Sequence, residues 1–305
     1  MKFHKHLLVA VISVGGAFGQ NGIKGVIAPD AKVELVKEGF TFLEGPLGTA
    51  DGGLYFSDLM GSNKTYRLEP NGNISVYRSN TNGTNGLAFN RSGELIGVEG
   101  DGKRISKAKP DGTVTAVTTG IAGMGLMAPN DLIGDPKGGI YFTDPGPRPL
   151  VAGRKAYVYY LPDGLSQPRI LDDTITRPNG LTLTNDGKKL IVDDTVGDTV
   201  FIFDVQSDGG VSNKRPFAKV QGVKPGTESG ADGMAIDSKD RLYVTSASGV
   251  QVFDKKGAYL GTIAVARQPS NVAFSGPRKK ILYITAREGL YKVPVLTAGP
   301  RRNGK

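Results

Sequence analysis

Six residues with side-chain oxygens stand at matching places along the chain, and together they could hold a divalent cation. Each precedes a short apolar alternation such as Leu87-Ala88-Phe89 or Met234-Ala235-Ile236, and successive members are 39 to 53 residues apart. Carboxylate and amide oxygens are the ligands that hard divalent cations prefer, and a carboxylate can also accept a proton from water. The six residues are Glu44, Asn85, Asn130, Asn179, Asp232 and Asn271.

The lack of other reactive side chains narrows the chemistry. The chain contains no cysteine, and its two histidines, His4 and His6, lie in the N-terminal leader described below. Once the leader is removed, the chain has neither histidine nor cysteine. Ser-His-Asp and Cys-His nucleophiles and N- or S-ligated zinc are therefore excluded, and no G-x-S-x-G motif occurs. A metal here must be held by oxygens alone, which favours Ca²⁺ or Mg²⁺, with Mn²⁺ as a further option.

The elements that must position these oxygens are short β-strands in a repeat. After most of the six positions comes a turn and then a strand-like run, for example Leu54–Phe56, Ile140–Phe142 or Leu242–Val244. A period of about 40 to 50 residues with several strands per unit is typical of a β-propeller, whose innermost strands surround one channel. We therefore expect an all-β, six-bladed β-propeller with four-stranded blades and a ring of oxygens on its axis.

The two ends of the repeat predict how the ring closes. Residues 32–36 alternate like a strand and are expected to pair with residues 289–295, so that an N-terminal strand completes the last blade. The propeller is expected over residues 31–297, with a linker over residues 20–30 and a flexible tail over residues 298–305.

Residues 1–19 have the pattern of a secretory signal peptide. Lys2 and Lys5 precede an apolar run from residue 7 to 18, and Ala17-Phe18-Gly19 is a small-x-small cleavage site. Cleavage after Gly19 predicts an exported protein, periplasmic or secreted. An uncleaved membrane anchor is the alternative, although the run is short for a span. No later segment reaches transmembrane length, so no membrane association is expected once the leader is removed.

The formal charge of +9 does not point to nucleic acid. The basic residues are dispersed except for Arg301, Arg302 and Lys305, and no basic stripe is interleaved with aromatic residues. We expect a small-molecule partner, and the sequence indicates no oligomeric state.

Structural roles compete with functional ones at several of these positions. Asn-Gly pairs commonly mark tight turns, which would explain Asn85 and, as channel structure, Asn271. A second recurring set of acids stands at the ends of second strands, where a carboxylate can cap a loop by accepting backbone N–H bonds. Glu44 and Asp232 differ, because a carboxylate aimed at a protein interior needs a partner such as a cation. The recurring acids are Asp58, Glu99, Asp144 and Asp194.

At these residues the chain resembles the gluconolactonase/regucalcin (senescence marker protein) family. The likeness covers nearly the whole chain after residue 40, and the motifs occur in the family's order. Any one of them is weak, whereas the ordered set is specific. The motifs are Leu43-Glu44-Gly45-Pro46, Leu54-Tyr55-Phe56-Ser57-Asp58, Asn85-Gly86-Leu87-Ala88-Phe89, Pro129-Asn130-Asp131-Leu132, Tyr141-Phe142-Thr143-Asp144-Pro145, Pro178-Asn179-Gly180-Leu181 and Asp232-Gly233-Met234.

The resemblance implies a six-bladed propeller that carries a divalent cation, often calcium, at the channel centre. It places the metal ligands at Glu44, Asn179 and Asp232, the catalytic base at Asp232 and a contact to substrate or to a metal-bound water at Asn130. The implied reaction is hydrolysis of a sugar lactone to its aldonic acid.

The chain departs from the family's pattern near the expected substrate mouth. It reads Leu126-Met127-Ala128 where relatives often have Leu-Asn-Ser, and Glu99-Gly100-Asp101 where many have Glu-His-Gly. Together with Arg148 in a proline-rich loop, Met127 and Glu99 are therefore candidate substrate contacts that bear on specificity.

Two other functions remain open on the residues alone. A non-catalytic binding propeller could use the same ion structurally, and another hydrolase or isomerase could use the same scaffold, because fold alone does not assign a reaction. The residues nevertheless suit catalysis: two carboxylates balance a divalent cation, and three protein ligands leave positions for water and substrate.

Overall fold

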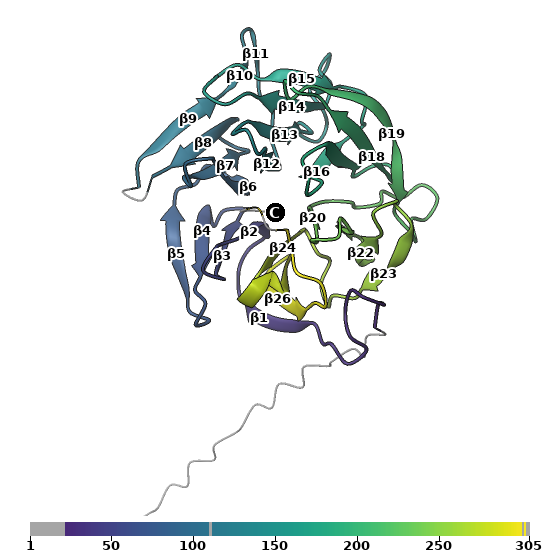
Figure 1. Cartoon of the computed structure of the whole chain (residues 1–305). Helices are drawn as coiled ribbons and strands as arrows, with labels where there is room; N and C mark the ends of the chain where they lie inside the picture. The colour runs from purple at the N-terminus through teal and green to yellow at the C-terminus, as the bar shows by residue number, and fades with distance from the viewer. Residues whose placement is uncertain (1–21, 110–111, 301, 303–305) are drawn as a thin grey trace, which may run out of the picture.

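The described part of the computed structural model, residues 22–109, 112–300 and 302, forms six four-stranded antiparallel sheets arranged in a ring (Figure 1). This confirms the predicted all-β, six-bladed propeller. Within the described residues the only helix is a 3-10 turn, η1 (Pro277–Lys279), and no helix has the length and apolarity that a membrane span requires. The predicted signal peptide, residues 1–19, lies outside the described residues and stays a prediction.

The first three blades follow the chain order, each from its innermost to its outermost strand. Blade one contains β2 (Leu43–Gly48), β3 (Leu54–Asp58), β4 (Lys64–Leu68) and β5 (Ile74–Ser79). Blade two contains β6 (Thr84–Phe89), β7 (Leu95–Glu99), β8 (Arg104–Ala108) and β9 (Val114–Thr118). A small hairpin, β10 (Gly120–Ile121) and β11 (Met124–Gly125), leads to blade three, which contains β12 (Leu132–Gly134), β13 (Ile140–Asp144), β14 (Tyr157–Leu161) and β15 (Arg169–Asp172).

Blades four to six continue this order, and the last one uses both ends of the chain. Blade four contains β16 (Pro178–Leu183), β17 (Lys189–Asp194), β18 (Thr199–Val205) and β19 (Val211–Lys219). Blade five contains β20 (Met234–Ile236), β21 (Leu242–Ser246), β22 (Gly249–Phe253) and β23 (Tyr259–Ile263). Blade six contains β24 (Asn271–Ser275), β25 (Ile281–Ala286), β26 (Gly289–Pro294) and, outermost, β1 (Glu34–Glu38).

The predicted closure of the ring by an N-terminal strand is confirmed. β1 pairs antiparallel with β26, with Glu34 opposite Lys292 and Glu38 opposite Gly289. The strand covers the outer edge of the last blade, which would otherwise present unpaired backbone groups.

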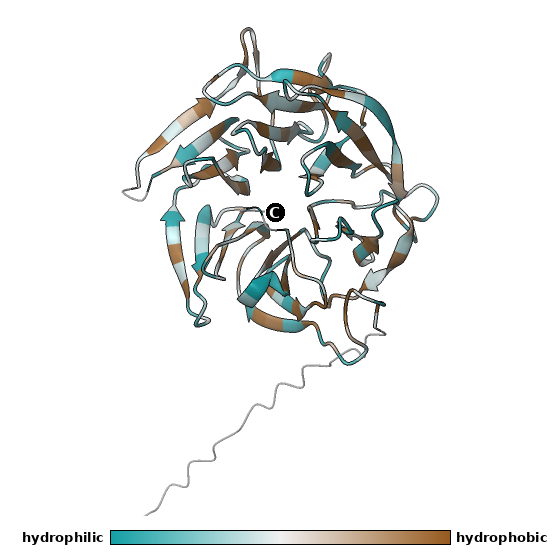
Figure 2. Ribbon diagram, in the orientation of Figure 1, coloured by the Kyte–Doolittle hydropathy of each residue, from teal (hydrophilic) through white to brown (hydrophobic). Residues whose placement is uncertain are grey.

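The inner strands lack the simple alternation of a one-sided sheet because neighbouring blades cover both faces. Every residue of β13 and β16 is buried, whereas the outermost strands β5 and β23 are partly exposed. The hydrophobic core accordingly lies between blades. For example, Tyr141 and Tyr160 of blade three cluster with Leu181, Leu190 and Phe203 of blade four, and Figure 2 shows hydrophobic residues in all the blades.

The segment expected to be a linker, residues 20–30, is instead packed from residue 22 onward. Val26 and Ile27 are fully buried and Ile23 nearly so, in the same cluster as the inner residues of blades five and six. Leu296 N–H donates to the carbonyl of Val26 at 2.8 Å. Three apolar side chains within five residues provide the burial that holds this turn in place.

The tail expected to be flexible, residues 298–305, is also packed where it is described. Ser238 N–H donates to the carbonyl of Ala298, and Gly299 N–H donates to the carbonyl of Lys279. The guanidinium of Arg302 donates to Leu183 O at 2.7 Å, Thr184 O at 3.0 Å and Thr182 Oγ1 at 3.1 Å. These partners lie at or just beyond the C-terminal ends of the innermost strands of blades four and five, and beside η1 in blade six. The tail therefore covers that end of the channel.

Hydroxyl groups on the second strands join neighbouring blades near the axis. In three places a Ser or Thr donates to a backbone carbonyl at the entry of the next blade's innermost strand. These bonds are Ser57 Oγ to Asn85 O at 2.8 Å, Thr143 Oγ1 to Asn179 O at 2.7 Å, and Thr245 Oγ1 to Ser270 O at 2.9 Å.

Glycines let the innermost strands approach one another closely. A Cβ on Gly45 would collide with the carbonyl of Asn85, and one on Gly180 would collide with the carbonyl of Asp232. Each innermost strand contacts the next around the ring, and β24 contacts β2 to close it.

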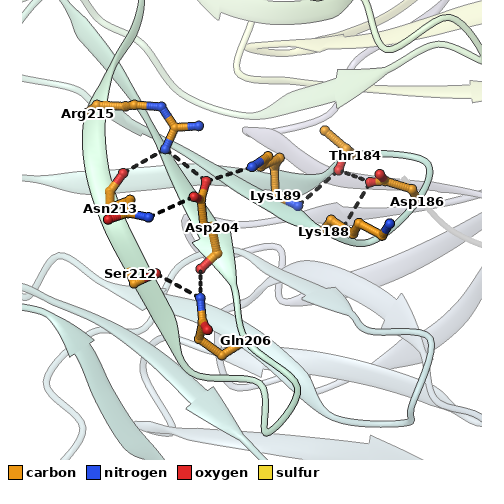
Figure 3. Close-up of polar contacts among 9 residues, drawn as sticks. All are labelled: Thr184, Asp186, Lys188, Lys189, Asp204, Gln206, Ser212, Asn213 and Arg215. Carbon is orange, nitrogen blue, oxygen red and sulfur yellow. Dashed lines mark hydrogen bonds and ion pairs between the residues drawn. The ribbon is translucent and has the colours of Figure 1, made fainter.

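At the periphery, charged side chains tie the outer strands of blade four together (Figure 3). Asp204 on β18 accepts from Lys189 Nζ of β17 at 2.7 Å and from Arg215 Nη1 of β19 at 2.9 Å, and Asn213 Nδ2 donates to its other oxygen at 3.0 Å. The hydrogen bond from Lys189 is the main reason that the pKa of Asp204 lies well below its usual value. This cluster is structural and lies away from the channel.

We predict that Gly180→Ala destabilises the protein, because the new methyl group meets a backbone carbonyl that cannot move cheaply. Overpacking of this kind typically costs about 1–3 kcal/mol. Gly125→Ala is the matched control, since its nearest neighbour would be Thr119 O at 3.7 Å and its φ is not positive. Urea unfolding should show a lower midpoint for Gly180→Ala only. Equal midpoints would show that the strands have room to separate.

We predict that Arg302→Ala also lowers stability, by about 1–3 kcal/mol, because it leaves buried acceptors at the end of β16 without their donor. Arg91→Ala removes the same charge from an exposed side chain near the same end of the channel and should change stability little. Thermal unfolding of the two variants makes the comparison. A tail that contributes nothing would leave both variants at the wild-type melting temperature.

Candidate functional site

The six predicted residues lie at equivalent places at one end of the channel. Three of them are the second residues of their strands: Glu44 in β2, Asn85 in β6 and Asn179 in β16. Asn271 is the first residue of β24. Asn130 and Asp232 stand two residues before β12 and β20. This is the end opposite the one that the C-terminal tail covers.

The side-chain amide of Asn271, in blade six, links carboxylates from two other blades. Asn271 Nδ2 lies 3.0 Å from Glu44 Oε2 and 3.4 Å from Asp131 Oδ2. Glu44 is only 2% exposed, and the same Oε2 atom also accepts the N–H of Gly45 at 3.0 Å. Asn271 therefore fixes the position of Glu44, and the side chains of blades one, three and six meet at this level of the channel.

Asp131 is a site residue that the sequence analysis did not single out. It is fully buried, and its Oδ1 accepts the N–H of Leu132 at 2.9 Å. Four repeats have glycine directly after the ring residue, whereas blade three has Asp131 at that place. This substitution of an acid for a recurring glycine was the available signal.

Asn179 provides an unsatisfied oxygen on the next part of the ring. It is 8% exposed, and its Oδ1 atom is buried without a hydrogen-bond partner in the described part of the chain. Gly180, the following residue, lies against the backbone of Asp232, so Asn179 and Asp232 are on adjacent, touching strands. An unpaired buried amide oxygen is costly, and a cation would satisfy it.

The donor set fits an oxygen-bound divalent cation. Glu44 and Asp232 supply two negative charges, and Asn179 supplies a neutral oxygen, as Ca²⁺ accepts. Among the residues that the structure describes, no group of three or more His, Cys, Asp or Glu side chains could hold a metal. The predicted set is consistent with that result because only two of its members are carboxylates.

Asp193 is a second buried acid near this ring. Its Oδ1 accepts the N–H of Gly180 at 3.1 Å, while its buried Oδ2 has no partner in the described residues. Complete burial, and then the neighbouring carboxylates Asp131 and Asp194, raise the pKa of Asp193 well above its usual value. A protonated Asp193 would contribute no charge to the ring.

Two of the recurring acids at second-strand ends, Asp58 and Asp144, cap loops by accepting backbone N–H bonds. Asp58 Oδ1 accepts the N–H groups of Thr41 and Phe42, both at 2.9 Å, and Asp144 accepts those of Met127 and Ala128 at 2.7 and 2.9 Å. In each case the capped residues lie two or three places before the ring residue of the same blade. These carboxylates therefore hold the loops that deliver Glu44 and Asn130 to the channel.

Glu99 was predicted to contact substrate, and its surroundings argue against that role. Its side chain is fully buried and is engaged by four neighbours. Arg104 Nε lies 2.6 Å from its Oε2, Arg78 Nη2 lies 3.1 Å from its Oε1, and Ser106 and Asn82 donate as well. Every oxygen is used within blades one and two, so Glu99 is a structural anchor.

Met127 was also predicted to contact substrate, but its side chain is 6% exposed. It packs in the cluster between blades two and three, where it lies under Gly146. The buried thioether of Met127 supports the loop that contains Gly146, and almost none of its surface is accessible to a substrate.

Arg148, the third predicted substrate contact, is half-exposed and bound to another residue. Its Nη1 and Nη2 atoms donate to the two carboxylate oxygens of Glu228 at 2.5 and 2.9 Å. Glu228 stands four residues before Asp232, so this ion pair joins the loops of blades three and five. A substrate role for Arg148 stays a prediction.

Asn130 and Arg177 complete the residues near the mouth. Asn130 is half-buried, and its backbone is fixed between blades two and three by bonds to Thr143 O and from Gly86 N–H. Arg177, which the sequence analysis did not single out, lies two residues before Asn179. Burial, and then the charge of Arg148, lower its pKa, while the charge of Asp232 opposes that shift. Arg177 is therefore close enough to Asp232 to interact with it electrostatically.

Comparison with known proteins places this chain in a family. The model of the SMP-30/Gluconolactonase/LRE-like region matches residues 42–288. A gluconolactonase from Zymomonas mobilis subsp. mobilis is 24% identical over 307 residues, with 91% of this chain and 85% of the relative covered.

Solved structures show the same fold. The gluconolactonase from Xanthomonas campestris matches with a TM-score of 0.79 and 28% identity, covering 93% of this chain and 99% of that one. Regucalcin from Agrobacterium tumefaciens, a calcium-binding protein, matches with a TM-score of 0.74 and 18% identity, covering 88% and 95% of the two chains. The ordered motifs, the six blades and a family model that spans most of the chain agree. This protein belongs to the SMP-30/gluconolactonase/LRE-like family.

Proposed function

We propose that this enzyme hydrolyses a sugar lactone to its aldonic acid, using a divalent cation held by Glu44, Asn179 and Asp232. The observation that carries the proposal is the unpaired, buried Oδ1 of Asn179 on a strand that touches Asp232. Relatives named gluconolactonase support lactone hydrolysis as the reaction.

The oxygen-only donor set favours Ca²⁺, with Mg²⁺ or Mn²⁺ as alternatives. When bound, such a cation would polarise the lactone carbonyl and stabilise the negative charge that develops on its oxygen. Asn271 contributes indirectly, because its amide holds Glu44 in place at 3.0 Å.

Exposure separates the two carboxylates into different roles. Glu44 is 2% exposed and accepts two N–H groups on one oxygen, so it is poorly placed to take a proton from water. Asp232 is half-buried and can be reached by water. We therefore assign the general base to Asp232.

Asp232 would accept a proton from the attacking water, whose oxygen bonds to the lactone carbonyl carbon. When the ring C–O bond breaks, Asp232 returns that proton to the leaving alkoxide, and the product is the open hydroxy acid. Asn130, held by its backbone between two blades, would orient the lactone with its side-chain amide. The predicted leader supports the further proposal that the enzyme works outside the cytoplasm.

We predict that Asn179→Leu abolishes metal binding without unfolding the protein, because it removes a ligand oxygen that has no other partner. Asn85→Leu is the matched control, since the Oδ1 of Asn85 is also buried and unpaired among the described residues but is not in the ligand set. In wild type and Asn85→Leu, metal at 100 times its Kd should add about 2.7 kcal/mol to the free energy of unfolding. Thermal unfolding with Ca²⁺, Mn²⁺ and chelator measures this. A response in Asn179→Leu equal to that of wild type would refute the assigned ligand.

We predict that Asp232→Asn and Glu44→Gln respond differently to excess metal. Both changes are near-isosteric and weaken binding by removing one charge, but only Asp232→Asn also removes the base. At saturating metal, turnover of Asp232→Asn should stay about 10²–10⁴-fold below wild type, whereas Glu44→Gln should recover much more. Lactone hydrolysis measured against metal concentration provides the readout.

Two results would redirect the interpretation. Equal recovery of Asp232→Asn and Glu44→Gln would confine Asp232 to a ligand role. Binding of metal by the wild type without hydrolysis of five- or six-membered sugar lactones would favour a non-catalytic binding propeller.

A further inference from the structure

Arg177 is a half-buried cation beside the proposed metal ligands that lacks a carboxylate of its own. Its Nη2 donates to Gly146 O at 3.1 Å and its Nη1 to Pro145 O at 3.4 Å, both neutral backbone carbonyls. None of the ion pairs within 4.0 Å in the described part of the chain includes Arg177. A guanidinium also has N–H donors beyond these two.

The other arginine at the mouth already has a carboxylate partner. Arg148 is bound through both Nη atoms to Glu228. Glu44 and Asp232 would balance the two positive charges of a bound cation. Glu228 and Asp232 act on Arg177 only through their charges, and no carboxylate of the described residues lies within 4.0 Å of its guanidinium.

The loop and strand around Arg177 hold it near the proposed metal ligands. It stands two residues before Asn179, and its backbone N–H is fixed by Asp194 Oδ1 at 3.0 Å. The two carbonyl groups that accept from Arg177 belong to Pro145 and Gly146, which follow Asp144 in the loop after β13. A half-buried arginine with spare donors is costly to maintain, and its planar fork matches a carboxylate or a phosphate.

We propose that Arg177 binds a terminal anionic group of the substrate, so that the preferred substrates are sugar lactones that carry a carboxylate or a phosphate at the end remote from the lactone carbonyl. This inference rests on the proposed lactone hydrolysis and adds the substrate class. Arg177 is thereby a specificity-determining residue.

The test compares substrates that differ only in the terminal group. Metal-loaded wild type and Arg177→Gln are assayed on the γ-lactones of gluconic acid, of glucaric acid and of gluconic acid phosphorylated at its terminal hydroxyl. The wild type should prefer an anionic lactone, and Arg177→Gln should lower kcat/KM on it about 10- to 100-fold while changing the neutral lactone little. The anionic lactone with the larger loss identifies carboxylate or phosphate as the group.

A structural tether would behave differently. If Arg177 only holds the loop that contains Pro145 and Gly146, the variant should lose the same factor on all three lactones, and the proposal is wrong. Arg287→Gln is the matched control: this arginine stacks on Phe42 and donates to Gln268, and its carbonyl accepts the N–H of Leu43 beside Glu44. The Arg287→Gln variant removes one charge near the same end of the propeller and should leave the substrate preference unchanged.

Binding of the open acids tests Arg177 without turnover. Calorimetry on the metal-loaded wild type should show tighter binding of glucarate or of the phosphorylated gluconate than of gluconate, and Arg177→Lys should reduce the difference because it keeps the charge but loses the fork. If the wild type hydrolyses none of the lactones, the proposed reaction fails, while this comparison still decides the role of Arg177. Equal affinities of the wild type for all three acids would overturn the inference.

Discussion

The close approach of the six innermost strands is the constraint on which the rest of the molecule depends. Gly45 and Gly180 lie where a Cβ would strike the backbone of the next blade, so the strands can come together only without side chains at those places. The residues just before them, Glu44 and Asn179, are members of the ring. Blade packing and site geometry are in this way set by the same contacts.

Polar groups brought together so tightly must find partners, and the ways in which they do so assign their roles. Asn271 pairs with Glu44 and Asp131, and burial raises the pKa of Asp193, which favours its neutral form. The Oδ1 of Asn179 finds no partner among the described residues. The Oδ1 of Asn85 is also unpaired among the described residues. What distinguishes Asn179 is that its strand touches the backbone of Asp232, one of the two proposed carboxylate ligands.

The channel has two different ends. Arg302 and the residues before it cover the ends of the innermost strands in blades four and five, whereas the ion pair of Arg148 with Glu228 and the unpaired charge of Arg177 lie near the proposed ligands. Substrate would therefore enter from the side on which Asp232 is half-buried. An arginine placed there without its own carboxylate gives this mouth a preference for anions.

The sequence by itself determined the six blades and the ring that contains Glu44, Asn179 and Asp232, because these features repeat and a period can be read from one chain. It also determined the closing strand β1, because residues 32–36 alternate like a strand and the last blade needs one more. Only the tertiary structure decided which partners surround each side chain, even at recurring positions. Glu99 is sequestered by Arg78 of the preceding blade, and the tail is held by contacts with strands far from it in sequence. Burial and charge balance at such positions depend on which blades touch, and no local pattern encodes that.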